Sequence, residues 1–244
     1  MFKQMFDNAS STFSYLLADD ESREAVLIDP VASHIEDYMA LLNQHNLSLK
    51  YALETHVHAD HITASGMLRE RLNIQTGVSS LCGAATANMQ LNDGDVVRFG
   101  AQQIQVIATP GHTPGSISFL WNERIFTGDA LLINSCGRTD FQGGDAGTLF
   151  DSISKRIFSL PDETLIYPAH DYNGKRVSNV AQEKATNKRI AGKTRDEFIE
   201  IMANLNLPKP TLIDITVAAN RRCGVPEPEV TQGWIKNSQS FIGY

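Results

Sequence analysis

Short apolar runs recur along the chain, separated by Gly, Pro, Asp and Asn residues, which favour turns. Each run is as long as a strand, and most contain β-branched or aromatic residues. The runs predicted to be strands are residues 13–19, 24–30, 50–55, 95–100, 103–110, 116–121, 124–129 and 164–170. Several strands follow one another before a helix intervenes, so their order predicts α+β layers rather than a strict βαβ alternation.

Helix-like segments lie between and after these runs. Residues 33–45 begin with Ser33, which is a favourable N-cap residue, and residues 62–72 and 147–160 also have helical character. These segments are expected to cover the sheets formed by the strands.

The last third of the chain differs from the rest because it is helical and polar. Residues 194–207 have the spacing of an amphipathic helix, and Pro-rich stretches follow near the C-terminus. We therefore predict a core over residues 1–176 that carries the functional site, and a helical and loop extension over residues 177–244 that packs on it.

The composition favours a folded protein with a small-molecule partner. Of 244 residues, 42% are hydrophobic and 20% are charged, which is ordinary for a globular chain. The formal net charge is −7 and the basic pairs are isolated, so no nucleic-acid partner is expected. No apolar stretch reaches the length of a membrane span, about 18 residues, and the first residues do not resemble a signal peptide. Three cysteines without a C-x-x-C spacing fit a reducing compartment, and we predict a cytoplasmic protein.

The stretch "THVHADHITASG", residues 55–66, places four ligand-type side chains within six positions: His56, His58, Asp60 and His61. It follows an apolar run and therefore begins at the C-terminal end of a predicted strand, where loops hold functional side chains on a rigid base. In an extended segment, positions two apart point the same way, so His56 and His58 are expected on one side. For two histidines alone, a solvated turn would be the alternative.

The same pattern recurs at three other strand ends. His112 lies in the turn "ATPGHTPGS", Asp129 follows Gly in "IFTGDAL", and His170 follows Pro and Ala in "LIYPAHDY". Five of the seven histidines thus lie in small-residue turns, where packed core histidines are not expected. We therefore predict a metal site. Imidazole and carboxylate suit zinc, iron, manganese or nickel, and the lack of cysteine ligands favours a catalytic site over a closed structural zinc site.

Taken together, the motifs resemble the metallo-β-lactamase superfamily. H-x-H-x-D-H is followed in order by G-H-T-P-G, G-D and P-A-H, and the resemblance covers nearly the whole chain. It implies an αββα sandwich, in which two facing mixed β-sheets are flanked by helices and hold metal at one edge. The fold alone does not decide the reaction, since it hosts hydrolases, oxygenases and flavoprotein partners.

Further stretches resemble one branch of this superfamily, the persulfide dioxygenases, which oxidise glutathione persulfide to sulfite. They are "ITAS" after the histidine cluster, "CGRTDFQGGD", "NLNLPKP" and "RCGV". The alternative is glyoxalase II, which hydrolyses S-D-lactoylglutathione at a dinuclear metal site and shares all seven metal-site positions. A typical glyoxalase II has a glycine pair at the "ITAS" position and a larger helical substrate domain, so the dioxygenase is favoured. A metal-free binding protein is disfavoured, because every ligand-type position is filled.

For a dioxygenase, the resemblance implies one Fe(II) per chain, held by His56, His112 and Asp129. Such a set leaves positions open for substrate and dioxygen side by side. The remaining residues are then expected to orient ligands and to hydrogen-bond the reacting atoms: His58, Asp60, His61 and His170. The substrate carboxylates need cations and hydrogen-bond donors, and the candidates are Arg138 first, then Tyr172, Thr113 and Arg222.

The implied reaction oxidises glutathione persulfide with dioxygen to sulfite and glutathione, a step of sulfide catabolism. Cys136 and Cys223 lie in the shared motifs but are assigned no catalytic role, and Cys82 is expected to pack as a small apolar residue. No rhodanese-like domain is predicted within the chain, so a sulfur transferase of that type would be a separate partner. A homodimer is the other assembly considered.

Overall fold

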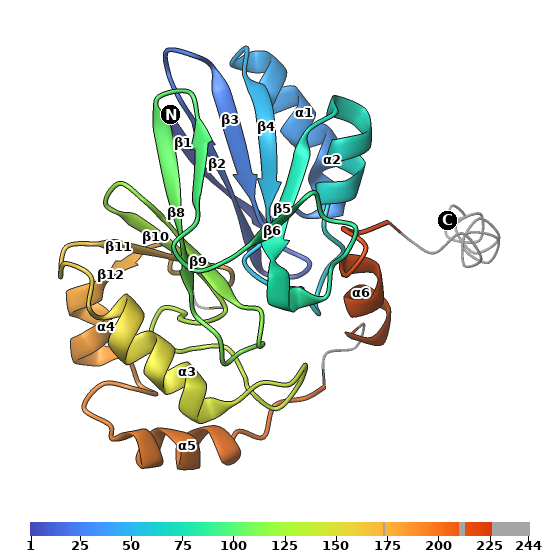
Figure 1. Cartoon of the computed structure of the whole chain (residues 1–244). Coiled ribbons are helices and arrows are strands. Elements are labelled where there is room, and N and C mark those ends of the chain that lie inside the picture. Colours follow the sequence, from blue (N-terminus) through green and yellow to red (C-terminus); the bar gives the residue numbers. More distant parts are fainter. Residues whose placement is uncertain (173, 210–212, 226–244) are drawn as a thin grey trace.

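The computed structural model describes residues 1–172, 174–209 and 213–225, and its centre is a pair of six-stranded sheets that face each other (Figure 1). The first sheet has the order β1-β2-β3-β4-β5-β6. Its strands are β1 (Phe2–Asp7), β2 (Thr12–Ala18), β3 (Glu24–Ile28), β4 (Ser48–Leu53), β5 (Gln75–Ser79) and β6 (Met89–Leu91). The strands pair antiparallel from β1 to β3 and parallel from β3 to β6.

The second sheet has the order β12-β11-β10-β9-β8-β7. Its strands are β7 (Val96–Phe99), β8 (Gln102–Ala108), β9 (Ile117–Trp121), β10 (Arg124–Gly128), β11 (Leu165–Pro168) and β12 (Ser178–Asn179). Only the β10–β11 pair is parallel among the paired strands of this sheet in the described residues. Both sheets are therefore mixed.

Helices cover the outer faces of the sandwich. Those that follow the strands of the first sheet are η1 (Ala32–His34), α1 (Ile35–Gln44), α2 (Ser65–Leu72) and the short η2 (Ser80–Cys82). Those of the second half are α3 (Ala146–Ser152), the π-helical η3 (Ile153–Ile157), α4 (Val180–Thr186) and α5 (Arg195–Ala203). A last helix, α6 (Ile213–Asn220), lies apart from α4 and α5, towards the first sheet (Figure 1).

Alternating side chains explain the layers. On β2, Leu17 belongs to the apolar cluster between the sheets and Leu16 to the cluster beneath α1 and α2, because successive strand residues point to opposite faces. A third cluster joins the second sheet to α3 and α5 through residues such as Leu149 and Phe198. These layers confirm the predicted αββα sandwich.

All eight predicted strands are present, but β1, β5, β6 and β12 were not predicted. The strand β5 has the sequence "QTGVS", and it is buried on most positions because its neighbours β4 and β6 enclose it, not because it is apolar. The Ser33 cap was a wrong prediction: Ser33 lies in η1, and α1 starts at Ile35 without a side-chain cap. By contrast, α5 begins with a capping box formed by Thr194 and Glu197.

The C-terminal extension starts in the second sheet, because Ser178 and Asn179 pair with β11. Its division from the core at residue 176 stays a prediction, and residues 210–212 and 226–244 of it lie outside the described residues. Among the described residues, no helix combines the length and the apolar character that a membrane crossing requires.

Candidate metal centre and its cleft

The predicted ligands gather at one edge of the sandwich, on loops from both sheets. The loop that starts with Thr55 follows β4, and His112 follows β8. Asp129 comes directly after β10, and His170 comes two residues after β11.

His56, His112 and Asp129 meet as predicted. Their ligand atoms lie within 4.8 Å of one another. The two imidazole rings are edge-to-face with centroids 4.9 Å apart, and His112 Nε2 is 3.5 Å from Asp129 Oδ2. One cation could therefore contact all three side chains.

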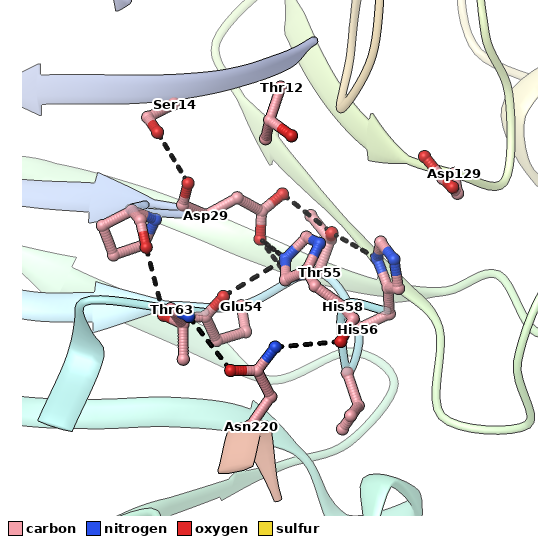
Figure 2. Close-up of polar contacts among 12 residues, drawn as sticks. Thr12, Ser14, Asp29, Glu54, Thr55, His56, His58, Thr63, Asp129 and Asn220 are labelled. Atoms are coloured by element: carbon pink, nitrogen blue, oxygen red, sulfur yellow. Dashed lines mark hydrogen bonds and ion pairs between the residues drawn. The ribbon is translucent and has the colours of Figure 1, made fainter. Parts of the chain in front are cut away.

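A buried hydrogen-bond chain orients His56. The backbone N–H of Thr55 donates to Asp29 Oδ1 at 2.7 Å, and the Thr55 hydroxyl donates to Asp29 Oδ2 at 2.8 Å (Figure 2). With its only hydrogen used in this way, the Thr55 oxygen accepts from His56 Nδ1, 3.0 Å away. Nε2 of His56 then carries the lone pair for a metal. Burial, with the neighbouring imidazoles of His58 and His112, holds the His56 pKa well below its usual value and keeps the ring neutral.

The backbone orients His112 and Asp129. His112 Nδ1 donates to the carbonyl oxygen of Arg138 at 2.7 Å, so its Nε2 also carries a lone pair. The N–H of Gly137 donates to the carbonyl oxygen of Asp129 at 2.7 Å. Asp129 Oδ1 is buried without a hydrogen-bond partner among the described residues, as expected of an atom that binds a cation. The three side chains therefore fit a metal ion by their donor atoms and by their fixed tautomers.

Two glycines allow the loops to approach each other. Gly128 has a φ of +54°, and a Cβ there would lie 2.6 Å from Thr55 Oγ1. Gly111 has a φ of +131°, and a Cβ there would lie 2.3 Å from the backbone nitrogen of Leu149. These contacts explain why Gly precedes Asp129 and His112 in the sequence.

His58 lies beside His56, with ring centroids 4.1 Å apart, but it has different partners. His58 Nε2 lies 3.1 Å from Asp29 Oδ1 and 3.3 Å from Glu54 Oε2. Burial alone would lower the His58 pKa, but the charge of Asp29 and its hydrogen bond raise it well above the usual value, and Glu54 adds to this. Asp29, Glu54 and His58 form a further group whose ligand atoms lie within 4.8 Å of one another.

Asp60, His61 and His170 gather around the hydroxyl of Thr12. Thr12 Oγ1 donates to Asp60 Oδ2 at 3.0 Å and lies 3.5 Å and 3.4 Å from Nδ1 of His61 and of His170. Burial would raise the Asp60 pKa, but the imidazoles of His170 and His61 hold it well below the usual value. His170 Nε2 faces Asp129 Oδ1 at 3.5 Å. His58, Asp60 and His61 also have ligand atoms within 4.8 Å of one another.

A cleft of about 470 Å³ opens onto these groups. Its wall includes the three predicted metal ligands together with Arg138 and Tyr172. The Tyr172 ring is largely exposed and stacks on His170, with centroids 5.7 Å apart. The Arg138 guanidinium is engaged: Nε and Nη2 donate to the two carboxylate oxygens of Asp140, both at 2.7 Å.

The other two predicted substrate-binding residues do not line the cleft. Thr113 is buried, and its hydroxyl lies 2.9 Å from that of Ser116. Arg222 follows α6. Sequence reasoning missed Arg189, which lines the cleft and donates to the carbonyl oxygen of Cys136 at 2.6 Å. It also missed Gln142, whose amide donates to the carbonyl oxygen of Val57 at 2.9 Å.

Comparisons with known proteins agree with this geometry. The sequence profile of the metallo-β-lactamase superfamily matches residues 7–81 and 90–170. The chain is 52% identical to the human protein named persulfide dioxygenase ETHE1, mitochondrial, over 93% of this chain and 90% of that protein. The chain belongs to the persulfide dioxygenase branch of the metallo-β-lactamase superfamily. The resemblance predicted from the motifs is thereby confirmed.

Solved structures agree with this membership of the persulfide dioxygenase branch. ETHE1 from Myxococcus xanthus is 54% identical, with a TM-score of 0.90 over 92% of this chain and 99% of that chain. A metallo-β-lactamase from Staphylococcus aureus is 28% identical, with a TM-score of 0.84 over 91% of this chain and 72% of that one. The name of the human relative places that protein in mitochondria, and a cytoplasmic location stays a prediction for this chain.

Proposed function

We propose that this chain oxidises glutathione persulfide with dioxygen to sulfite and glutathione, at one iron ion held by His56, His112 and Asp129. The observation that carries the proposal is the 52% identity with the human persulfide dioxygenase over almost the full length of both proteins. The donor set supports iron, because two imidazoles and one carboxylate without thiolate are typical of non-haem Fe(II) oxygenases. Such an ion would supply the redox chemistry and open coordination positions.

The chain itself supplies orientation and shielding. Thr55 and the Arg138 carbonyl each hold an Nδ1–H, so that the Nε2 atoms of His56 and His112 face the same point. His170 is held in the same manner, because its Nδ1 lies 3.2 Å from the carbonyl oxygen of Ser11. Its Nε2 is thereby directed towards the cleft, where it can hydrogen-bond the reacting group.

The persulfide sulfur is expected to bind as an anion, because a persulfide is more acidic than a thiol and a nearby cation stabilises the charged form. The glutathione carboxylates need cations along the cleft wall. Arg138 remains the first candidate, and Arg189 is the second cation on that wall. Tyr172, whose ring covers His170, would pack against the peptide part of the substrate. A separate sulfur transferase that supplies the persulfide, and a homodimer, stay predictions.

Thioester hydrolysis at two metal ions is the second candidate. The observation in its favour is that His61 Nε2, like Asp129 Oδ1, is buried without a hydrogen-bond partner among the described residues. A second metal ion could bind both His61 Nε2 and Asp129 Oδ1. Against it, the relative that is 52% identical to this chain is named a persulfide dioxygenase, whereas the relative named Glyoxylase B2 from Dictyostelium discoideum is 26% identical.

The test uses anaerobically purified protein loaded with Fe(II). Oxygen uptake is recorded on addition of glutathione persulfide, sulfite is measured at the end, and S-D-lactoylglutathione hydrolysis is assayed on the same sample. The proposal expects oxygen consumed together with sulfite formed, and no thioester cleaved. Thioester cleavage without oxygen uptake would instead establish the dinuclear hydrolase.

A further inference from the structure

The loop from His58 to Thr63, which carries Asp60 and His61, is held by a helix more than 150 residues away in the sequence. We infer that Asn220, the last residue of α6, is a positioning residue that fixes this loop at the metal centre. The inference rests on the proposed function in one respect, namely that the loop borders a bound iron ion.

The Asn220 carboxamide is buried, and both its oxygen and its nitrogen hydrogen-bond to the loop backbone. Its Nδ2 donates to the carbonyl oxygen of His58 at 2.9 Å and to that of His61 at 2.8 Å. Its Oδ1 accepts from the N–H of Thr63 at 3.0 Å. Figure 2 shows Asn220 between the backbone of His58 and that of Thr63. The reverse orientation would place an oxygen against two carbonyl oxygens, so these partners define which atom is nitrogen.

The loop belongs to no named strand or helix, and only its end has backbone support, since Thr63 forms an isolated bridge with Val31 and the carbonyl oxygen of Ile62 accepts from the N–H of Ala32 at 2.8 Å. Asn220 supplies the hydrogen bonds to the carbonyl groups of His58 and His61. The same helix supplies a second contact: Thr216, one turn before Asn220, donates to the carbonyl oxygen of Ala59 at 2.7 Å. Asn220 and Thr216, on one face of α6, thus donate to the carbonyl oxygens of His58, Ala59 and His61. Without Asn220, the buried carbonyl oxygens of His58 and His61 would lose hydrogen bonds, which is costly away from water.

The turn after α6 brings two sequence motifs into contact. The N–H of Gly66, in "ITASG", donates to the carbonyl oxygen of Cys223, in "RCGV", at 2.7 Å. A Cβ on Gly224 would lie 2.0 Å from the carbonyl oxygen of Thr63, so this approach requires a glycine. Val217 of α6 packs on an apolar cluster that includes Val57, between the first two histidines of the metal motif. The segment that contains "RCGV" therefore packs directly against the segment that carries the histidine motif.

Asparagine is specific for this role. Aspartate has nearly the same shape, but it would place a carboxylate oxygen against the carbonyl oxygens of His58 and His61 and lose both donated hydrogen bonds. The loop would then shift, together with the imidazole of His61 and the carboxylate of Asp60. None of the three proposed iron ligands lies on this loop, so the shift should alter the surroundings of the iron and not its ligand set. Removal of groups that support a metal centre typically changes metal affinity or turnover by about 10- to 100-fold, and here we expect the effect on turnover.

The experiment compares Asn220→Asp with the wild type, both loaded with Fe(II). Iron retention is measured by competition with a chelator, and the electron paramagnetic resonance spectrum of the nitric oxide adduct reports the iron geometry. We expect the adduct spectrum to change, because the displaced loop borders the iron, while iron affinity changes by less than about threefold, because the loop carries none of the proposed ligands. We also expect kcat with glutathione persulfide to fall by about 10-fold or more, while KM changes by less than about threefold.

Two controls separate positioning from general destabilisation. Asn204→Asp makes the same chemical change at the exposed C-cap of α5, where it should lower Tm slightly but match the wild type in iron affinity, adduct spectrum, kcat and KM. Leu42→Ala removes a buried side chain from the cluster beneath the first sheet; it should lower Tm but leave the adduct spectrum unchanged.

A folded Asn220→Asp variant with a wild-type adduct spectrum and wild-type kcat would overturn the inference. If that variant does not fold, Thr216→Val is measured instead. A smaller change in the adduct spectrum and in kcat supports the inference, and a wild-type spectrum with wild-type kcat overturns it. A wild-type protein that binds iron but consumes no oxygen would refute the proposed function instead, and the iron readouts would still test Asn220.

Discussion

The two sheets hold their proposed metal ligands in different ways. On the first sheet, His56 is oriented by side chains, since its Nδ1 bonds to Thr55 and Thr55 bonds to Asp29. On the second sheet, His112 and Asp129 are oriented by the backbone of the segment that follows β10. A side-chain contact can be removed by a conservative substitution, whereas a backbone contact is lost only when the path of the chain changes. We call His56 and its side-chain supports the side-chain half of the site, and His112 and Asp129 with their backbone supports the backbone half. The two halves should respond to different mutations.

Gly137→Ala should have the largest effect, because it moves the backbone half. A Cβ there would lie 2.4 Å from the carbonyl oxygen of Asp129 and 2.9 Å from His112 Nδ1, so the segment must shift. Displacement of reacting groups by about 1 Å can cost about 100-fold in rate, and we expect a loss of that order in kcat/KM for glutathione persulfide. As the control, Gly192→Ala has open space and a φ of +67°, so it should cost about 1 kcal/mol of stability and no activity. Equal activity of the two variants would contradict the description of the backbone half.

Thr55→Val tests the side-chain half with almost no change in volume. The His56 N–H loses its acceptor, and Asp29 loses one hydrogen bond. We expect iron affinity, measured by chelator competition, to fall by about 10- to 100-fold with the fold retained. Thr186 is exposed, and the Thr186→Val variant serves as the control and should bind iron normally. Wild-type affinity in Thr55→Val would show that the hydroxyl does not orient His56.

Arg138→Lys separates a backbone role from a side-chain role within one residue. Lysine retains the carbonyl oxygen that accepts from His112, so iron content should not change. A bidentate guanidinium is not replaced by a point charge, and KM for glutathione persulfide should rise by about tenfold. Steady-state kinetics over a range of substrate concentrations would measure this, and an unchanged KM would remove Arg138 from the substrate site.

The smallest effect is expected for the alkylation of Cys82 and Cys136, which should react very little in the folded protein. Burial raises the pKa of Cys82 to about 12 and that of Cys136 to about 11. The reactive thiolate forms only as the pH rises towards these values, so both thiols should resist iodoacetamide near neutral pH in the folded protein. Mass spectrometry before and after denaturation in urea would count the labelled thiols. Rapid labelling of Cys136 in the folded protein would show that it is accessible from the cleft.

The local sequence pattern singles out three side chains that the structure brings together, but it gives no sign of most of the groups that support them, for a physical reason. His56, His112 and Asp129 stand next to strand ends in small-residue turns, which is a local pattern. Asn220 has no such signal, because its role depends on where α6 lies relative to a loop more than 150 residues earlier. Asp29 did have a signal, since it follows a strand and precedes Pro30, as other site residues follow strands.

Arg138 illustrates a second limit of sequence reasoning. Its charged side chain suggests a role in substrate binding, but its observed contact with a proposed metal ligand, His112, is made by its carbonyl oxygen, which every residue possesses. Strand β5 illustrates a third limit, because small polar residues become buried only through their neighbours in the sheet. Both features depend on tertiary structure, which local patterns do not contain.

The central claim is that a single iron ion is held by His56, His112 and Asp129, with Asp60 outside the ligand set. Its most direct test is the iron content of Asp129→Ala and Asp60→Ala, purified anaerobically and measured beside the wild type. We predict about one iron per chain in the wild type and in Asp60→Ala, and almost none in Asp129→Ala. Two metal ions per wild-type chain, with one of them lost in Asp60→Ala, would contradict this account and favour the dinuclear hydrolase.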